Sequence, residues 1–189
     1  NGANTLLLKD VVFNPYALKI EMESFKSKTG LSPTVFVDRR CLITTPYHIA
    51  KNRITERQLK HGSCGAGIWA TKEYAAKYPD SALRVADLDD SNTFAEKCQE
   101  IQKNILSEVD GFDKKEGDDD WLYANKSEDF QYFYGLCAPI TYVRLFESEI
   151  HELTKNGNLI FEGHQGVLLD ENHGYMPYVS GSGDCTSKA

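Results

Sequence analysis

Residues 62–68 form a glycine-rich stretch whose small side chains would let the backbone approach an anion. The stretch reads Gly-Ser-Cys-Gly-Ala-Gly-Ile. Glycines at this density expose amide groups to a phosphate ahead of a helix. It is not a Walker A loop, because Ile68 stands where that loop has lysine. The pattern predicts a phosphate-binding loop that includes Ser63 and Cys64, and a tight turn packed against a neighbour is the alternative.

A second stretch has the residue types that hold a base. Three apolar residues, 159–161, lead into Gln165, which lies between two glycines. This pattern predicts a buried strand that ends in a turn at a ligand site. The carboxamide of Gln165 offers donors and acceptors and suits the edge of a purine, and the alternative is an amide that ties two loops together. His164 beside it is a candidate ligand contact, with a structural role as the alternative.

Other polar residues give weaker signals. Ser180 lies among glycine and serine, which suits a phosphate oxygen as well as an ordinary linker. The five histidines show no close metal-ligand spacing, and we expect His173 to be hydrogen-bonded to the turn before Pro177. Three adjacent aspartates, 118–120, predict a solvated loop, because neighbouring acids do not converge on one ion without a special turn. We therefore expect no metal site and no hydrolase triad.

The spacing of apolar residues predicts the elements that position these groups. Apolar runs at 6–8 and 11–13 lead into a helix that begins at Asn14-Pro15, a strand feeding a helix. Residues 34–45 read as one interrupted strand. Residues 47–60 read as a helix that ends in a glycine cap at Gly62.

Three more helices are predicted in the second half of the chain. The first begins at Asn92 and carries an apolar stripe, which consists of Phe94, Cys98, Ile101, Ile105 and Val109. A second runs from Ser127 to near Pro139. A third, around residues 146–153, ends at a glycine cap at Gly157 and precedes the strand at 159–161. The order of elements indicates an α/β chain.

The composition fits one soluble domain. A chain of 189 residues can bury one core, and its net charge of −7 argues against a nucleic-acid surface. Five widely spaced cysteines, odd in number, favour a reducing compartment. With no bilayer-length apolar run and no leader, we expect a cytoplasmic protein without membrane contact. The chain starts at Asn1 without methionine, so we expect a single domain or the central fragment of a longer protein.

Two segments resemble the signature of the adenylosuccinate synthetase family, whose enzymes use GTP to join aspartate to inosine monophosphate (IMP). Residues 162–170 read Glu-Gly-His-Gln-Gly-Val-Leu-Leu-Asp and are followed by His173-Gly174, Pro177-Tyr178-Val179 and Ser180. Residues 62–69 are similar to the family's Gly-Thr-Thr-Gly-Arg-Gly-Ile-Gly. The departures from the family pattern include Ser63, Cys64, Ala66, His164, Ser180 and Gly181.

The resemblance implies an IMP site. In the family the second threonine of the glycine loop contacts the phosphate, so this role falls to Cys64, a weak donor, with Ser63 beside it. Gln165 would contact the nucleotide, and Ser180 replaces a threonine that binds the same phosphate. A family arginine reaches the nucleotide across the dimer interface, and Lys77 is its nearest cationic counterpart here.

The resemblance also implies the fold and the chemistry. We expect part of a P-loop-NTPase-like synthetase fold, with a helical insertion at about 91–155. The intact enzyme would be a homodimer that uses GTP, Mg²⁺ and aspartate, with neither GTP nor Mg²⁺ bound by this chain alone. The family's loops with the catalytic aspartate and histidine have no counterpart in these residues. We therefore expect no catalytic residue in this chain and no phosphate transfer by it alone.

Two alternatives stay open. Cys64, Ala66 and His164 admit a variant synthetase that acts on a guanylate and gives a product of the 2-aminoadenylosuccinate type. The other alternative is a non-catalytic relative that keeps nucleotide binding for assembly or regulation.

Overall fold

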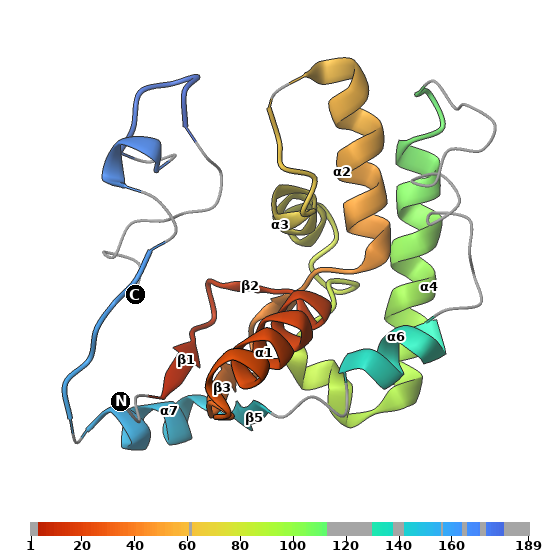
Figure 1. Cartoon of the computed structure of the whole chain (residues 1–189). Coiled ribbons are helices and arrows are strands. Elements are labelled where there is room, and N and C mark those ends of the chain that lie inside the picture. Colours follow the sequence, from red (N-terminus) through yellow and green to blue (C-terminus); the bar gives the residue numbers. More distant parts are fainter. Residues whose placement is uncertain are drawn as a thin grey trace.

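The computed structural model describes residues 4–60, 62–112, 130–137, 142–155, 157–163, 166–170 and 173–179. A parallel sheet lies at its centre, in the strand order β1 (Thr5–Leu7), β3 (Val35–Asp38), β5 (Tyr142–Leu145). A second parallel pair joins β2 (Val12–Phe13) to β4 (Leu42–Ile43) (Figure 1). The predicted α/β class, with strands and helices alternating along the chain, is confirmed.

Helix α1 (Pro15–Thr29) follows β2 and carries the chain back to the start of β3. Such a crossover is needed because parallel neighbours cannot be joined by a tight turn. The Asn14 side chain accepts the Ala17 amide at 3.0 Å, Pro15 occupies the first turn, and Gly30 ends the helix with φ 72°. The prediction of a strand before Asn14 and a helix after it is confirmed.

Residues 34–45 do not form the single interrupted strand that their composition predicts. β3 and β4 belong to different sheets, because the chain turns between them. The buried Asp38 carboxylate accepts the Arg40 amide at 2.8 Å, and the Asp38 carbonyl accepts the Cys41 amide at 3.0 Å. This turn takes the following residues out of the first sheet, so that Leu42 pairs with Val12.

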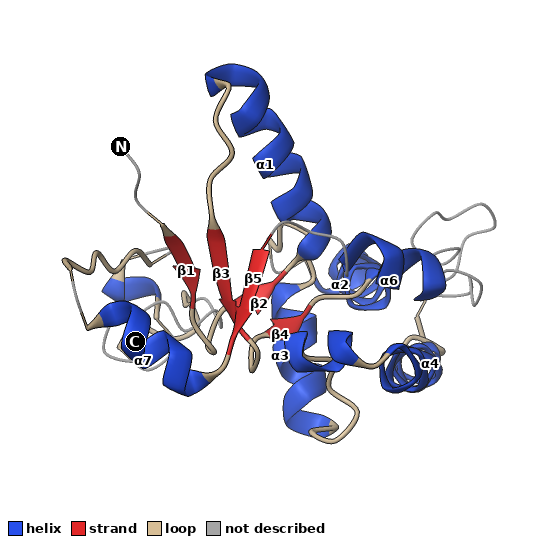
Figure 2. Ribbon diagram, turned by 90° about the horizontal axis from the view of Figure 1, so that it is seen from below, coloured by secondary structure: helices blue, strands red, loops and turns tan. Residues whose placement is uncertain are grey.

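Helices cover the strands from two sides. Figure 2 shows α2 (Pro46–Leu59), α3 (Ile68–Lys77), α4 (Ser91–Glu108) and α6 (Phe130–Cys137) on one side and α7 (Glu147–Thr154) on the other. Two short 3₁₀ helices complete the described elements, η1 (Val85–Asp89) before α4 and η3 (Val167–Leu169) after α7. The range 91–155 holds α4, α6 and α7, but it also holds β5, so the chain returns to the central sheet within it.

The apolar stripe of α4 lies in the main core, as its spacing predicts. All five members are fully buried: Phe94, Cys98, Ile101, Ile105 and Val109. The Phe94 ring lies 5.7 Å from the Phe133 ring and 5.1 Å from the Tyr134 ring, centre to centre, which packs α6 on α4. Helix α6 ends at Cys137, as the proline that follows in the sequence predicts.

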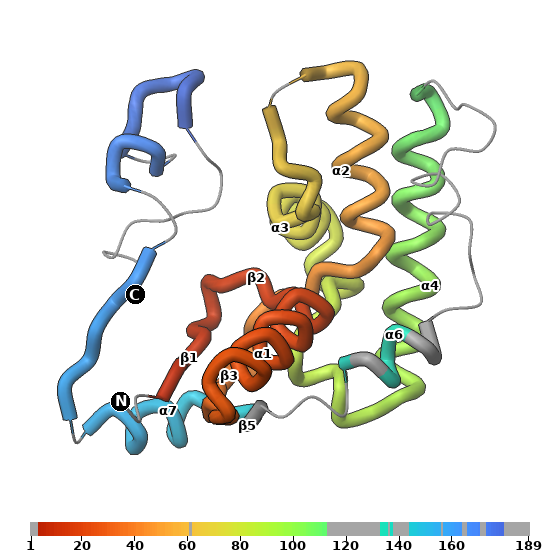
Figure 3. Tube along the Cα trace, in the orientation of Figure 1, coloured from red at the N-terminus to blue at the C-terminus, as the bar shows by residue number. Residues whose placement is uncertain are grey.

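The buried strand predicted at residues 159–161 is wrong. These residues lie in no strand, and the Ile160 side chain is 93% exposed. A strand needs a neighbour that pairs with its backbone, and within the described part of the chain neither sheet extends to this segment. Figure 3 shows the segment after α7 at the left of the view, apart from the layer of α2, α3 and α4. Among the described residues, no helix is both long enough and apolar enough to cross a membrane.

Candidate phosphate-binding loop

The glycine loop, residues 62–67, joins α2 to α3 and lies against the first turn of α2. The predicted glycine cap of α2 is wrong: Lys60 takes the left-handed conformation (φ 53°), and its amide donates to the Glu56 carbonyl at 2.8 Å. Gly67 at the other end has φ 77°, and a Cβ there would lie 2.9 Å from the Ile49 amide nitrogen. Both the backbone angle and this close approach require glycine at Gly67.

One buried side chain holds the loop. Asn52 of α2 is only 9% exposed, and its Oδ1 accepts from the Ser63 hydroxyl at 3.0 Å and from the Gly67 amide at 3.1 Å. The Ser63 oxygen in turn accepts from the Gly65 amide at 3.2 Å. The amides of Gly65 and Gly67 are therefore used within the protein.

The amides that alternate with these two along the chain are available to a ligand. No acceptor within the described ranges meets the amides of Cys64, Ala66 and Ile68. Gly67 is the N-cap of α3 and supplies no side-chain cap. The uncapped start of a helix carries a partial positive charge that attracts phosphate. The arrangement can therefore bind a phosphate through main-chain donors.

Buried polar groups fix the helices behind the loop. The Thr71 hydroxyl donates to the Gly67 carbonyl at 2.8 Å and lies 3.1 Å from the Thr44 hydroxyl. Thr45 caps α2 and forms a reciprocal pair with His48, whose Nδ1 accepts the Thr45 amide at 3.2 Å. Burial lowers the pKa of His48 to about 3, so the imidazole is neutral and its proton lies on Nε2. These contacts hold the base of the loop in one arrangement.

The two predicted phosphate contacts of the loop offer different groups. The Ser63 hydroxyl gives its hydrogen to Asn52, so Ser63 is left with only its main chain for a phosphate. Cys64 is exposed and carries a free thiol. A thiol is a weak donor, and the Cys64 amide is the stronger one. The main-chain amides are therefore the stronger donors that this loop offers to an anion.

Lys77 lies at the end of α3 that is far from the loop, about 14 Å along the helix axis from Ile68. Its ammonium nitrogen lies 2.6 Å from Glu108 Oε1 and 5.0 Å from the centre of the Tyr78 ring. The hydrogen bond to Glu108 raises the pKa of Lys77 and keeps it charged. Lys51 contacts the same carboxylate at 2.7 Å. Lys77 is therefore too far from the loop of its own chain to join it.

His164, Gln165 and Ser180 lie outside the described residues. The neighbouring residues form a turn around Asp170, which is fully buried. The Asp170 carbonyl accepts the Gly174 amide at 2.7 Å, and Asp170 Oδ1 lies 3.1 Å from His173 Nδ1. The hydrogen-bonded role predicted for His173 is confirmed.

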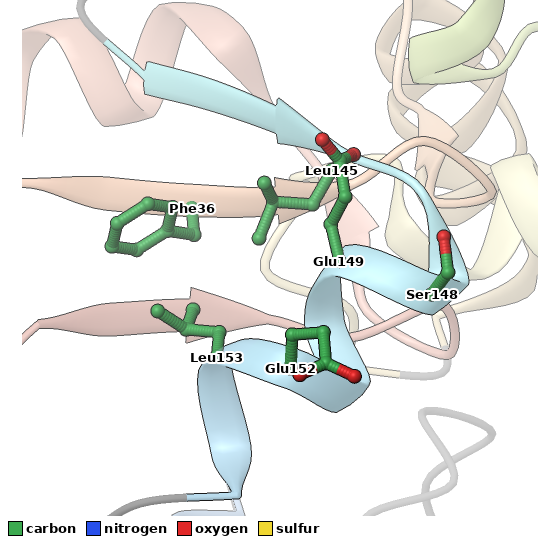
Figure 4. Close-up of a pocket in the computed structure, with 6 residues that line it drawn as sticks. All are labelled: Phe36, Leu145, Ser148, Glu149, Glu152 and Leu153. Carbon is green, nitrogen blue, oxygen red and sulfur yellow. The ribbon is translucent and has the colours of Figure 1, made fainter.

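A separate hollow of about 460 Å³ lies between the sheet and α7 (Figure 4). Its lining consists of Phe36, Leu145, Ser148, Glu149, Glu152 and Leu153. The lining includes two carboxylates and no cationic side chain, so it repels a phosphate. No group of three or more His, Cys, Asp or Glu side chains in the described ranges could hold a metal ion.

Asn52 is the residue of this site that the sequence reasoning missed. The buried face of α2 includes Tyr47, Ala50 and Ile54, at helical spacing. His48 and Asn52 lie four residues apart and so share the next face. Both are polar at neutral pH without a charge, whereas charged residues fill much of the rest of the helix. That contrast was the available signal for a buried polar face.

Comparisons with known proteins show which family this chain resembles. The family model described as adenylosuccinate synthetase matches residues 1–189. The chain is 32% identical over 187 residues to an adenylosuccinate synthetase of Marinomonas sp., covering 96% of this chain and 41% of the relative. It is 31% identical over 176 residues to the synthetase of Desulforamulus reducens, covering 91% of this chain and 40% of the relative. The chain thus spans about two-fifths of the length of these curated relatives.

A solved structure shows the same fold. The fully ligated adenylosuccinate synthetase of Plasmodium falciparum superposes with a TM-score of 0.69 at 19% identity. The match covers 96% of this chain and 41% of that chain. Since the family model covers the whole sequence, the chain belongs to the adenylosuccinate synthetase family.

Proposed function

We infer that this chain provides the IMP-binding portion of an enzyme of purine nucleotide biosynthesis. The complete enzyme would ligate L-aspartate to IMP, with hydrolysis of GTP, to give adenylosuccinate. The observation that carries this proposal is the family match over all 189 residues. The uncapped start of α3 supports it, because its amides suit the 5′-phosphate of a nucleoside monophosphate.

Each predicted site residue has a role in this proposal. The amides of Cys64, Ala66 and Ile68 hold the phosphate, with Ser63 contributing through its main chain. The Ser180 hydroxyl adds a donor to the same phosphate, and Gln165 contacts the purine, with His164 beside it. Lys77 approaches the nucleotide of a second copy in a homodimer. These roles describe binding, and no catalytic acid, base or nucleophile is assigned to this chain.

GTP and Mg²⁺ belong to the complete enzyme in this proposal. GTP supplies the phosphoryl group that activates the purine 6-oxygen for displacement by aspartate. The described ranges hold no cluster of metal-ligating side chains, so this proposal assigns no metal ligand to them. The work of this chain is to bind IMP and orient it. We also propose that these 189 residues form one structural unit of the longer family fold. The proposed location of the protein is the cytoplasm.

The test measures product formation by the full-length protein with IMP, GTP, Mg²⁺ and L-aspartate. We expect GTP-dependent formation of adenylosuccinate, identified by chromatography, and no turnover by the 189-residue chain alone. Binding of IMP without any product would favour the non-catalytic relative. Turnover by the 189-residue chain alone would contradict the assignment of binding without catalysis.

A guanylate-specific variant is the second candidate, because Ala66 leaves the loop without the cationic side chain of the family pattern. Calorimetry that compares IMP with deoxyguanylate separates the two. A strong preference for deoxyguanylate would replace IMP as the substrate.

A further inference from the structure

One acceptor atom ties both ends of the glycine loop to the neighbouring helix. Oδ1 of Asn52 accepts from Ser63 near the start of the loop and from Gly67 at its end, at 3.0 Å and 3.1 Å. A carbonyl oxygen has two lone pairs, so this atom is saturated by the loop. The Asn52 side chain belongs to α2, and it ties both ends of the loop to that helix.

The same atom decides which amides a ligand can reach. Because the Ser63 hydrogen is committed to Asn52, the Ser63 oxygen is free to accept the Gly65 amide at 3.2 Å. Gly65 and Gly67 thus donate inward, and the amides of Cys64, Ala66 and Ile68 meet no acceptor among the described residues. Inward and available amides alternate along the loop. Without the Asn52 acceptor, both the Ser63 hydroxyl and the Gly67 amide would lose the partner that ties them to α2.

We propose that Asn52 is the positioning residue of the phosphate site: its carboxamide oxygen fixes the glycine loop so that alternate amides face the monophosphate. The inference rests on the proposed function, because it takes the loop to be a phosphate site. Asn52 acts through the loop and does not itself contact the ligand. Its neutrality matters as well, since a carboxylate at this position would place a negative charge next to the bound phosphate.

Three variants of the full-length protein separate the loss of the acceptor from the gain of charge. Asn52→Leu removes the acceptor, and we expect the dissociation constant for IMP to rise about ten-fold or more. Ser63→Ala removes one of the two hydrogen bonds and should raise it by a few-fold. Asn52→Asp keeps both hydrogen bonds, so it should weaken binding mainly through repulsion, and added salt should reduce that loss.

Asn104→Leu is the matched control. The Asn104 amide lies on α4 in the same helical layer and donates to the Tyr74 hydroxyl at 3.0 Å, away from the loop. We expect this variant to lower the melting temperature without changing IMP binding by more than about two-fold. A merely structural role for Asn52 would make Asn52→Leu behave in the same way.

Binding of IMP and of inorganic phosphate is measured by calorimetry, and the rate of alkylation of Cys64 with and without IMP reports on the loop. The proposal is supported if Asn52→Leu loses affinity for both probes and loses protection of Cys64 by IMP. The proposal is overturned if Asn52→Leu keeps the wild-type affinity. Should that variant not fold, the proposal is overturned if Ser63→Ala and Asn52→Asp, measured as separate variants, both keep the wild-type affinity. Wild-type protein that binds neither probe would refute the proposed function itself, and the inference with it, whereas wild-type binding with unaffected variants refutes the inference alone.

Discussion

The glycine loop and the C-terminal stretch, residues 157–179, carry the two family signatures, and they differ in how the chain supports them. The loop is anchored on the buried side chains of Asn52 and Thr71. The described part of the C-terminal stretch is fixed locally by the turn around Asp170. That stretch exposes many large apolar side chains: Leu159, Ile160, Phe161, Val167, Leu168, Leu169, Tyr175, Met176 and Tyr178.

The difference shows which half of the proposed site this chain can preform. The loop finds its hydrogen-bond partners in the adjacent helices, so contacts within the described residues determine its geometry. Burying one large apolar side chain contributes about 1.5–3 kcal/mol to the free energy of unfolding. The exposed apolar side chains of the C-terminal stretch do not make this contribution. We therefore expect the phosphate half of the site to be set by this chain, and the half that includes residues 157–179 to depend on further contacts.

Replacing Gly67 by alanine should have the largest effect on the loop. The new Cβ would lie 2.9 Å from the Ile49 amide nitrogen at a φ of 77°, so the loop must move. We expect IMP affinity to fall roughly 100-fold, with a loss of about 3 kcal/mol in the free energy of unfolding. Calorimetry and urea denaturation measure the two quantities.

Gly30→Ala is the matched control for that variant. Gly30 has a similar φ of 72°, but a Cβ there meets nothing within 4 Å. It should cost about 1 kcal/mol of stability from backbone strain alone and leave IMP binding unchanged. Equal effects of the two variants on binding would refute the close packing of the loop on α2.

The burial of His48 at the base of the glycine loop should make the free energy of unfolding depend on pH. Folded His48 has its pKa lowered from 6.5 to about 3 by burial, so between these values the unfolded chain binds a proton that the folded chain does not. Stability is then fully present above pH 6.5 and falls as the pH drops, by up to about 1.4 kcal/mol per pH unit. Urea denaturation of His48→Asn between pH 6.5 and 5 should show a flatter slope than the wild type. An unchanged slope would mean that His48 is accessible to water in the folded state.

Cys64→Thr should change IMP affinity by a smaller amount, and it tests whether the side chain at this position contacts the phosphate. A hydroxyl is a stronger donor than a thiol, so we expect IMP to bind about three-fold more tightly. Cys64→Ala serves as the control and should bind about as well as the wild type, because the amide is retained. Weaker binding by Cys64→Thr than by Cys64→Ala would show that the side chain is directed away from the phosphate.

Ile160→Ser in the 189-residue chain should have the smallest effect, within about 0.5 kcal/mol of stability, since the side chain is 93% exposed. Ile101→Ala is the matched contrast, because Ile101 is fully buried and its truncation should cost about 2–5 kcal/mol. Denaturant unfolding of both variants makes the comparison. A large loss from Ile160→Ser would mean that the C-terminal stretch is supported by this chain after all.

Patterns of neighbouring residues predicted the elements that are stabilised by contacts between residues close in the sequence. The Asn14-Pro15 cap and the α4 stripe were predicted because capping and helical burial follow from adjacent residues. The position of the glycine loop was predicted for the same reason. The residues that fix its conformation were not, since Asn52 comes from another element and meets the loop only after folding.

Long-range pairing accounts for the errors. The apolar residues 159–161 have the composition of a buried strand, but composition does not show whether a neighbouring strand exists to pair with them. The apolar pattern of residues 34–45 predicts one strand, because it does not show the hydrogen bonds of the Asp38 side chain and carbonyl that turn the chain. Lys60 is the C-cap of α2 instead of Gly62, because the residue with the left-handed conformation directly follows the last helical turn, two residues before Gly62.

A crystal structure of the full-length protein with IMP tests the central claim most directly. We predict a phosphate oxygen within about 3.2 Å of at least two of the amides of Cys64, Ala66 and Ile68, with the hydrogen bonds from Ser63 and Gly67 to Asn52 intact. A monophosphate bound elsewhere, with those amides facing only water, would contradict the account.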